Sequence, residues 1–95
     1  MLFVITAFDR PGALEPRMTV RPAHLRYLEE RATQIRIGGP LLNENEQPMG
    51  SLLIIEAADR AAAEAFAAGD PYRTEGVFEK VEIRPWHAAL GGWIG

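Results

Sequence analysis

Cysteine is absent from this chain of 95 residues. There can therefore be no disulfide, no thiolate nucleophile and no Cys-ligated zinc site, and the composition suits a reducing compartment. A long hydrophobic run is also missing, because the apolar start at residues 1–5 meets Thr6 and Asp9 too soon for a signal-peptide core or a membrane span. We expect a cytoplasmic location and no membrane partner.

Positive charge is scarce: the chain has ten Lys and Arg residues and thirteen Asp and Glu residues, which gives a net charge of -3. Binding to a phosphate backbone depends on clustered cations, so nucleic acid is not an expected partner. The two histidines, His24 and His87, are far apart, and no spacing of histidine and carboxylate residues completes a metal site. We expect no metal and no cofactor.

The length of the chain predicts a single domain over residues 1–95. A core of this size has little apolar surface to spare for a deep internal cavity. Any ligand site is therefore expected at an edge of the domain or between subunits.

The apolar patterns predict four strands and two helices. The strands are expected over residues 2–8, 35–42, 51–57 and 77–86, and the helices over residues 20–34 and 59–69. Residues 10–19 show no period and are expected to form a loop, with Thr19 capping the first helix and Pro22 in its first turn. The run Gly38-Gly39-Pro40 is expected to break the second strand, either as a bulge or as a place where other atoms approach the backbone closely.

Each predicted helix carries an apolar stripe. The stripe of the first helix consists of Leu25, Leu28 and Ala32, and that of the second consists of Ala62, Ala65, Phe66 and Gly69. Asp59 is expected to cap the second helix, and Gly69 to end it.

This order of elements predicts an α+β fold of βαββαβ topology, in which two helices cover one face of a four-stranded antiparallel sheet. The first and third strands carry apolar residues that we expect to be buried on both faces, so the uncovered face would expose a large apolar patch. We expect a homodimer through this open face. The tail, residues 88–95 with Trp93 and Ile94, is expected to dock across the dimer.

His24 and Asp70 form the candidate site. His24 opens the first predicted helix beside its stripe, and Asp70 follows the end of the second helix and precedes Pro71. Because the two helices lie side by side in this topology, the start of one can approach the end of the other. Taken singly, each residue also has an ordinary structural explanation, as a boundary histidine and as a turn aspartate.

A carboxylate bonded to one imidazole nitrogen fixes the tautomer and leaves the other nitrogen free to accept a proton. No serine or cysteine is clearly supplied as a nucleophile, so the chemistry that the pair favours is proton abstraction and return: isomerisation, elimination or lactone-type rearrangement.

Six further residues are candidate substrate contacts. Arg21 and Arg10, together with Arg17, could hold a carboxylate or phenolate, Ser51 could supply a hydroxyl, and Tyr72 and Trp86 could form an aromatic wall. The alternatives are solvated arginines, a strand-start serine and aromatic rings that pack in the core or the dimer.

Several segments resemble the YciI-like (YCII-related) family. They are residues 21–28 (RPAHLRYL), 39–42 (GPLL), 50–56 (GSLLIIE), 70–72 (DPY) and 81–86 (VEIRPW). The resemblance implies a ferredoxin-like fold of the dimeric α+β barrel superfamily, in which His24 and Asp70 match the residues regarded as the active-site pair. Members of that superfamily act on intermediates of aromatic degradation or bind small molecules.

Three hypotheses follow for the function. The first is a small homodimeric lyase or isomerase in which His24 is general base and acid. The second is a non-catalytic module that binds a small anionic metabolite in the same pocket. In the third, the chain is a structural homodimer, and His24 is an ordinary boundary residue.

Overall fold

The computed structural model describes residues 1–93 of the chain. Its strands are β1 (Leu2–Asp9), β2 (Ile35–Leu42), β3 (Pro48–Glu56) and β4 (Phe78–Trp86). Its helices are α1 (Leu14–Glu30), α2 (Arg60–Gly69) and the short α3 (Pro71–Thr74), with a 3-10 turn at Ala32–Gln34. The predicted strands are confirmed to within a few residues, and α3 was not predicted.

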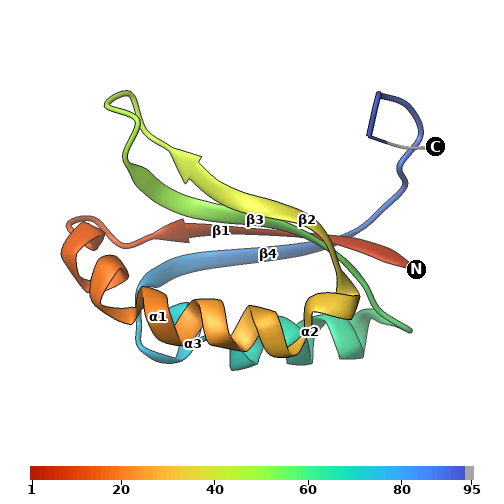
Figure 1. Ribbon diagram of the computed structural model, residues 1–95, viewed down its shortest axis with the longest axis horizontal. Coiled ribbons are helices and arrows are strands. Elements are labelled where there is room, and N and C mark those ends of the chain that lie inside the picture. The colour runs from red at the N-terminus through yellow and green to blue at the C-terminus, as the bar shows by residue number, and fades with distance from the viewer. Residues whose placement is uncertain (94–95) are drawn as a thin grey trace.

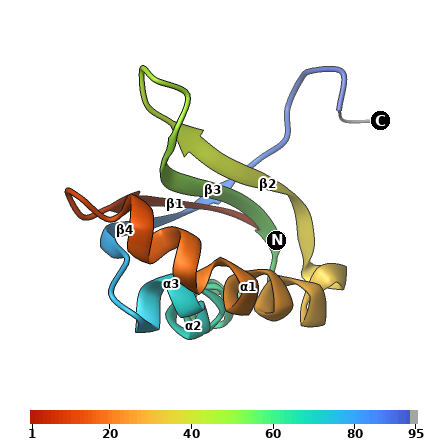
Figure 2. The ribbon, with the colours of Figure 1, turned by 60° about the vertical axis from the view of Figure 1, so that its left-hand side comes forward.

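The strands form one antiparallel sheet in the order β2-β3-β1-β4. Figures 1 and 2 show α1, α2 and α3 on one side of this sheet, whereas no helix of residues 1–93 covers the other side. This is the ferredoxin-like α+β fold, as predicted.

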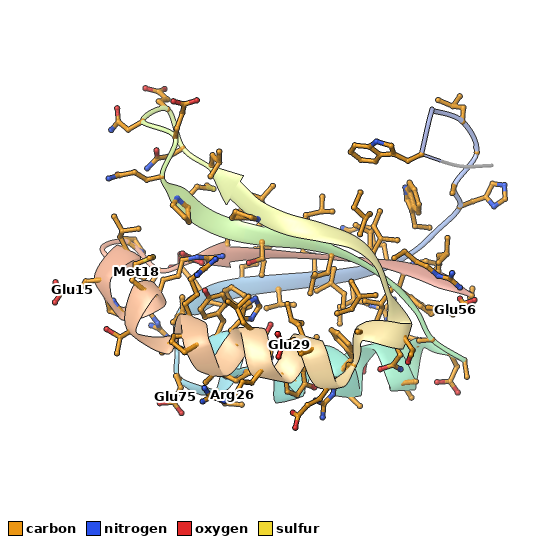
Figure 3. All side chains as sticks on the ribbon, in the orientation of Figure 1. Glu15, Met18, Arg26, Glu29, Glu56 and Glu75 are labelled. Atoms are coloured by element: carbon orange, nitrogen blue, oxygen red, sulfur yellow. The ribbon has the colours of Figure 1, made fainter. Side chains whose placement is uncertain are left out.

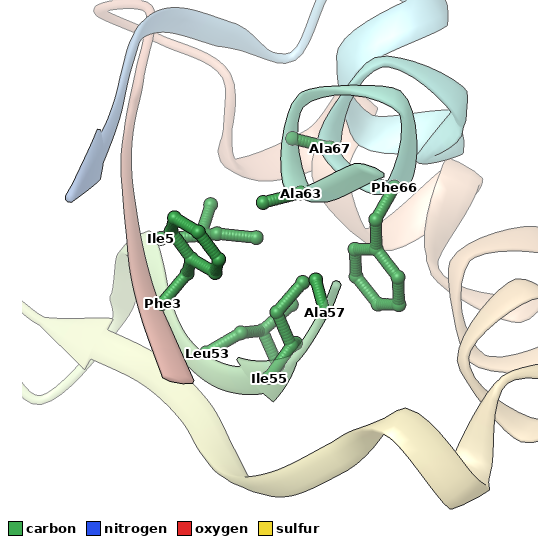
Figure 4. Packing of buried hydrophobic residues seen from close by; sticks show 8 residues of the cluster. All are labelled: Phe3, Ile5, Leu53, Ile55, Ala57, Ala63, Phe66 and Ala67. Carbon is green, nitrogen blue, oxygen red and sulfur yellow. The ribbon is translucent and has the colours of Figure 1, made fainter. Parts of the chain in front are cut away.

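The core lies between the sheet and α2. Phe3 and Ile5 of β1 point toward α2, where they meet the buried Phe66 (Figure 4). The side chains between them on β1, such as Val4, are only half-buried, because they point to the open face. The expectation that β1 is buried on both faces is therefore wrong for a single chain.

The first helix differs most from its prediction. It begins at Leu14 rather than at residue 20, so most of residues 10–19 are helical. Thr19 is not a cap, because its hydroxyl donates to the carbonyl oxygen of Glu15 one turn earlier. Pro22 lies inside the helix and not in its first turn.

The cause of this error is the composition of the helix face that points toward the sheet. The buried residues of α1 are Arg17 and His24, both polar, whereas the predicted stripe residues Leu25 and Ala32 are exposed. A search for apolar periodicity cannot detect a helix whose buried face carries charge.

The second helix begins as expected, since the Asp59 side chain accepts a hydrogen bond from the backbone nitrogen of Ala62. Its buried face is shifted by one residue, however. The buried residues are Ala63, Phe66 and Ala67, whereas the predicted Ala65 and Gly69 are exposed. In a stretch this rich in alanine, nearly every face is apolar, so the pattern does not fix the orientation.

The second strand runs unbroken through Gly38, Gly39 and Pro40, which contradicts the predicted interruption. Its register shifts occur instead near Ile35 and near Leu42. A side chain at Gly38 would overlap Leu53 of β3, so the expected close approach to the backbone is confirmed at this glycine. Pro40 is tolerated because β2 is an edge strand.

The tail after β4 rises on the open side of the sheet (Figure 1). Leu90 and Trp93 are 87% and 88% exposed, values that are unusual for large apolar side chains. Tail and open face together enclose a groove of about 860 Å³. Ile94, which we expected to help dock the tail, lies outside the described residues.

Candidate active site

His24 and Asp70 lie in contact beneath α1. The Nδ1 atom of His24 is 2.8 Å from Oδ1 of Asp70, and both side chains are buried. His24 comes from the second half of α1, and Asp70 occupies the junction between α2 and α3. The packing of the helices against each other therefore joins residues that are distant in the sequence.

The position of Asp70 is fixed by its own backbone. Asp70 follows the last residue of α2 and caps α3, where its Oδ1 accepts a hydrogen bond of 2.9 Å from the backbone nitrogen of Tyr72. Pro71 occupies the first turn of α3, where a missing N–H costs nothing. An Asp-Pro pair is a sequence signal for such a start, and it could have revealed α3.

The second imidazole nitrogen of His24 faces open space. In residues 1–93 no buried side-chain nitrogen or oxygen lacks a hydrogen-bond partner, and Nε2 has none there. Nε2 is therefore reached by solvent, and His24 lines a cleft of about 510 Å³ between α1 and the edge of the sheet. Met18 and Glu29 of α1, two of the residues that line this cleft, are labelled in Figure 3.

Tyr72 forms one wall of the cleft. Its ring stacks on the imidazole of His24, with centroids 3.9 Å apart and an angle of 17° between the planes. The guanidinium carbon of Arg17 lies 4.4 Å from the centroid of the same ring. Burial raises the pKa of Tyr72 above its ordinary value of 10.0, whereas Arg17 and then Arg21 act to lower it.

Arg17 is the most extensively bonded residue of the site. It donates two hydrogen bonds to Asp9, of 2.8 and 3.0 Å, one to the carbonyl oxygen of Gly50 and one to Oγ of Ser51. The side chains of Arg17 and Asp9 are only 5% and 6% exposed. The sequence placed Arg17 in a loop and did not single out Asp9, although an arginine seven residues before a helical histidine lies on the same helix face.

The remaining candidates separate into two groups. Arg21 and Ser51 line the cleft beside His24, Arg21 being exposed and Ser51 buried. Arg10 and Trp86 do not line it. Arg10 donates a 2.6 Å hydrogen bond to the carbonyl oxygen of Gly76, and Trp86 lies on the groove of the open face.

Two further features of residues 1–93 bear on the type of site. They contain no group of three or more His, Cys, Asp or Glu residues that could hold a metal ion. Nor is any helix among them long and apolar enough to cross a membrane. The polar side chains that line the cleft are an imidazole, a phenol, a hydroxyl, two guanidinium groups and one carboxylate, those of His24, Tyr72, Ser51, Arg17, Arg21 and Glu29.

A family model described as the YCII-related domain matches residues 1–87. The chain belongs to the YCII-related family. Protein YciI of Escherichia coli is 38% identical over 94 residues, which cover 90% of this chain and 96% of that protein. The resemblance in the sequence motifs is confirmed.

Solved structures support the same assignment. A 5-chloro-2-hydroxyhydroquinone dehydrochlorinase of Burkholderia phenoliruptrix, solved in complex with 2,5-dihydroxybenzoquinone, is 35% identical, with a TM-score of 0.87 over 94% of this chain and 96% of that one. An antibiotic biosynthesis monooxygenase has a TM-score of 0.54 and 19% identity over 95% and 100% of the two chains, which shows the fold alone. The fold of this YCII-related chain is that of the dimeric α+β barrel proteins.

Proposed function

We propose that this chain is a small enzyme of lyase or isomerase type in which His24 transfers protons and Asp70 orients it. The observation that carries the proposal is the 2.8 Å contact between Nδ1 and Asp70, which leaves Nε2 open to the cleft. With Asp70 ionised, Nδ1 keeps the ring proton and Nε2 keeps a lone pair. That is the arrangement of a general base.

A relative of known activity supports the reaction class. The relative from Burkholderia is a dehydrochlorinase, and it is 35% identical to this chain. In a step of that kind, His24 takes a hydroxyl proton and returns it to a ring carbon. Loss of a second hydroxyl proton then expels chloride with its bonding electron pair, so the net change is loss of HCl and no oxidant is needed.

The substrate class is a small planar ring that carries negative charge. The wall of the cleft is the Tyr72–His24 stack, which is flat. Arg21 is exposed at the cleft and has no ion-pair partner within residues 1–93, so its charge is available to a phenolate or carboxylate.

The first experiment measures chloride release from 5-chloro-2-hydroxyhydroquinone. His24→Ala and Asp70→Asn should each lower the rate by about 100-fold or more, because general acid–base catalysis contributes 10²- to 10⁴-fold. The matched control is His87→Ala, which removes the other, exposed histidine and should leave the rate unchanged.

The orienting role of Asp70 has its own readout. Nitrogen NMR of the imidazole distinguishes a proton on Nδ1 from one on Nε2, and the parent should hold it on Nδ1. Asp70→Asn should mix the two tautomers. A parent with the proton on Nε2 would contradict the proposal. Binding of the compound without turnover would favour the alternative, a module that captures a small anionic metabolite.

The open sheet face supports a second proposal, a homodimer formed sheet to sheet with the tail docked across it. Side chains such as Val4 and Ile54 are apolar and half-buried there, and the tail residues Leu90 and Trp93 border the same groove. Sedimentation should give twice the mass of the chain, and Ile54→Glu should give a monomer. A monomeric parent at micromolar concentration would refute the proposal.

A further inference from the structure

Arg17 is a cation whose two terminal nitrogens are both engaged. Nη1 donates to both carboxylate oxygens of Asp9, and Nη2 donates to the carbonyl oxygen of Gly50 and to Oγ of Ser51. The ion pair with Asp9 also balances its charge. Although Arg17 borders the cleft, it is therefore poorly suited to bind a substrate anion directly.

The bond from Arg17 to Ser51 determines what the serine hydroxyl can do. Nη2 of Arg17 donates to Oγ of Ser51 at 2.8 Å, so the oxygen is already an acceptor and its hydrogen must point elsewhere. Within residues 1–93 that hydrogen has no acceptor, and Ser51 lines the cleft that also contains His24. Accepting a bond from a cation polarises the O–H group and makes it a stronger donor.

From these contacts we infer that Ser51 donates to the substrate oxygen on which negative charge grows, and that Arg17 is the positioning residue that reserves the hydroxyl for this bond. The inference rests on the proposed function and deepens it. When His24 removes a hydroxyl proton, negative charge grows on that oxygen and on any oxygen conjugated to it, and a hydrogen-bond donor there stabilises the charge. The site would thus select rings with a hydroxyl group within reach of His24 and with that oxygen, or a carbonyl or phenolic oxygen conjugated to it, within reach of Ser51.

A purely structural role for Ser51 makes different predictions. If Ser51 only anchored Arg17, its loss would loosen the Asp9 pair but would not act on a bound oxygen. The probe that separates the two roles is 2,5-dihydroxybenzoquinone, a planar ring with two carbonyl and two hydroxyl oxygens, titrated calorimetrically at neutral pH. Its binding requires no turnover.

Ser51→Ala should weaken binding of the probe by roughly 10- to 100-fold, the range for a hydrogen bond to a charged group. Ser51→Thr, which keeps the hydroxyl, should restore affinity to within a few fold of the parent. If Ser51→Ala does not fold, Ser51→Cys serves in its place, because a thiol is a weak donor in nearly the same volume. Equal affinity of the parent and the variant without the hydroxyl overturns the inference.

The role of Arg17 is tested by a double-mutant cycle. Arg17→Lys should lower the affinity of the parent for the probe. In the Ser51→Ala background it should lower the affinity little further, because Arg17 acts through the hydroxyl. The control is Arg31→Lys, which changes an arginine stacked on the other tyrosine and should leave affinity unchanged. Equal losses in both backgrounds would mean that Arg17 acts structurally, and would overturn this part.

The parent itself gives two distinguishable outcomes. A parent that binds the probe through Ser51 but releases no chloride supports the inference while the proposed proton transfer fails. A parent that does not bind the probe at all overturns the inference, whereas chloride release would still support the proposed function.

Discussion

The chain contains two tyrosines, and each carries a stacked arginine. The guanidinium carbon of Arg17 is 4.4 Å from the ring centroid of Tyr72, and that of Arg31 is 3.6 Å from that of Tyr27. The hydroxyl groups differ, however. That of Tyr27 donates a 2.8 Å hydrogen bond to the carbonyl oxygen of Phe66, whereas that of Tyr72 has no partner within residues 1–93.

This difference separates a structural cluster from a candidate site. At Tyr27 the phenol joins α1 to α2 through Phe66, and the partly exposed Arg31 donates to the carbonyl oxygen of Tyr27 one turn earlier. At Tyr72 the arginine, Arg17, is buried and paired with Asp9. The phenol of Tyr72 and one imidazole nitrogen of His24 remain open to a cleft. Donors that no protein group uses are available to a ligand, which is what the proposed site at Tyr72 requires and what the Tyr27 cluster lacks.

The largest expected difference between the two clusters is in stability. Arg17→Met leaves the buried Asp9 carboxylate unpaired and should lower the free energy of unfolding by about 3–5 kcal/mol. Arg31→Met removes a partly exposed stack and should cost about 1 kcal/mol or less. Urea denaturation of both variants measures the contrast, and similar losses would contradict it.

The next largest expected change in stability comes from the packing around Tyr27. A methyl group at Gly69 would lie 2.5 Å from the Tyr27 hydroxyl oxygen, so Gly69→Ala should destabilise the chain by about 1–3 kcal/mol through overpacking. The same substitution in a Tyr27→Phe chain should cost less, because the nearest atom is gone. Thermal melts of the four chains test this, and equal costs in both backgrounds would refute the explanation.

Removal of the two tyrosine hydroxyl groups should have opposite effects on stability and on ligand binding. Tyr27→Phe loses the bond to Phe66 and should cost about 1 kcal/mol of stability without affecting the cleft. Tyr72→Phe loses no protein bond, so its stability should change by less than about 0.5 kcal/mol while binding of 2,5-dihydroxybenzoquinone weakens. Chemical denaturation and calorimetry measure the two properties. A Tyr72→Phe chain that is destabilised but binds normally would reverse the comparison.

The sequence predicts the strands of the fold better than it predicts the contacts of the site. The strands are predicted well because they contain dense runs of aliphatic residues, such as Leu52, Leu53 and Ile54 of β3. The pairing of His24 with Asp70 was predicted from the topology, which packs the two helices side by side, but the reason was only half right. Asp70 does lie at the end of α2, whereas His24 lies in the second half of α1 and not at its start.

The first half of α1 could not be found in the same way. Its buried face depends on Arg17, and an arginine becomes a core residue only when a partner such as Asp9 neutralises it. That partner lies on β1, eight residues away in the sequence, and only the fold shows that the two side chains meet. For the same reason Ser51 could be named as a contact, whereas its bond to Arg17 could not be predicted.

The smallest expected effect concerns the ionisation of the two phenols. Burial raises the pKa of both Tyr27 and Tyr72 above 10.0, so the folded chain holds these protons more tightly than the unfolded chain. Their contribution to stability is therefore complete below about pH 10 and is lost as the pH rises through the folded values.

Arg21 distinguishes the two tyrosines, because it lowers the pKa of Tyr72 and not that of Tyr27. Arg21→Ala should therefore raise the pKa of Tyr72 further and leave Tyr27 where it is. The ultraviolet absorbance of tyrosinate, followed against pH in Tyr27→Phe and Tyr72→Phe chains, isolates each phenol. Should Arg21→Ala move both phenols equally or neither of them, Arg21 would not face the cleft in solution, and its proposed role in binding the substrate anion would fail with it.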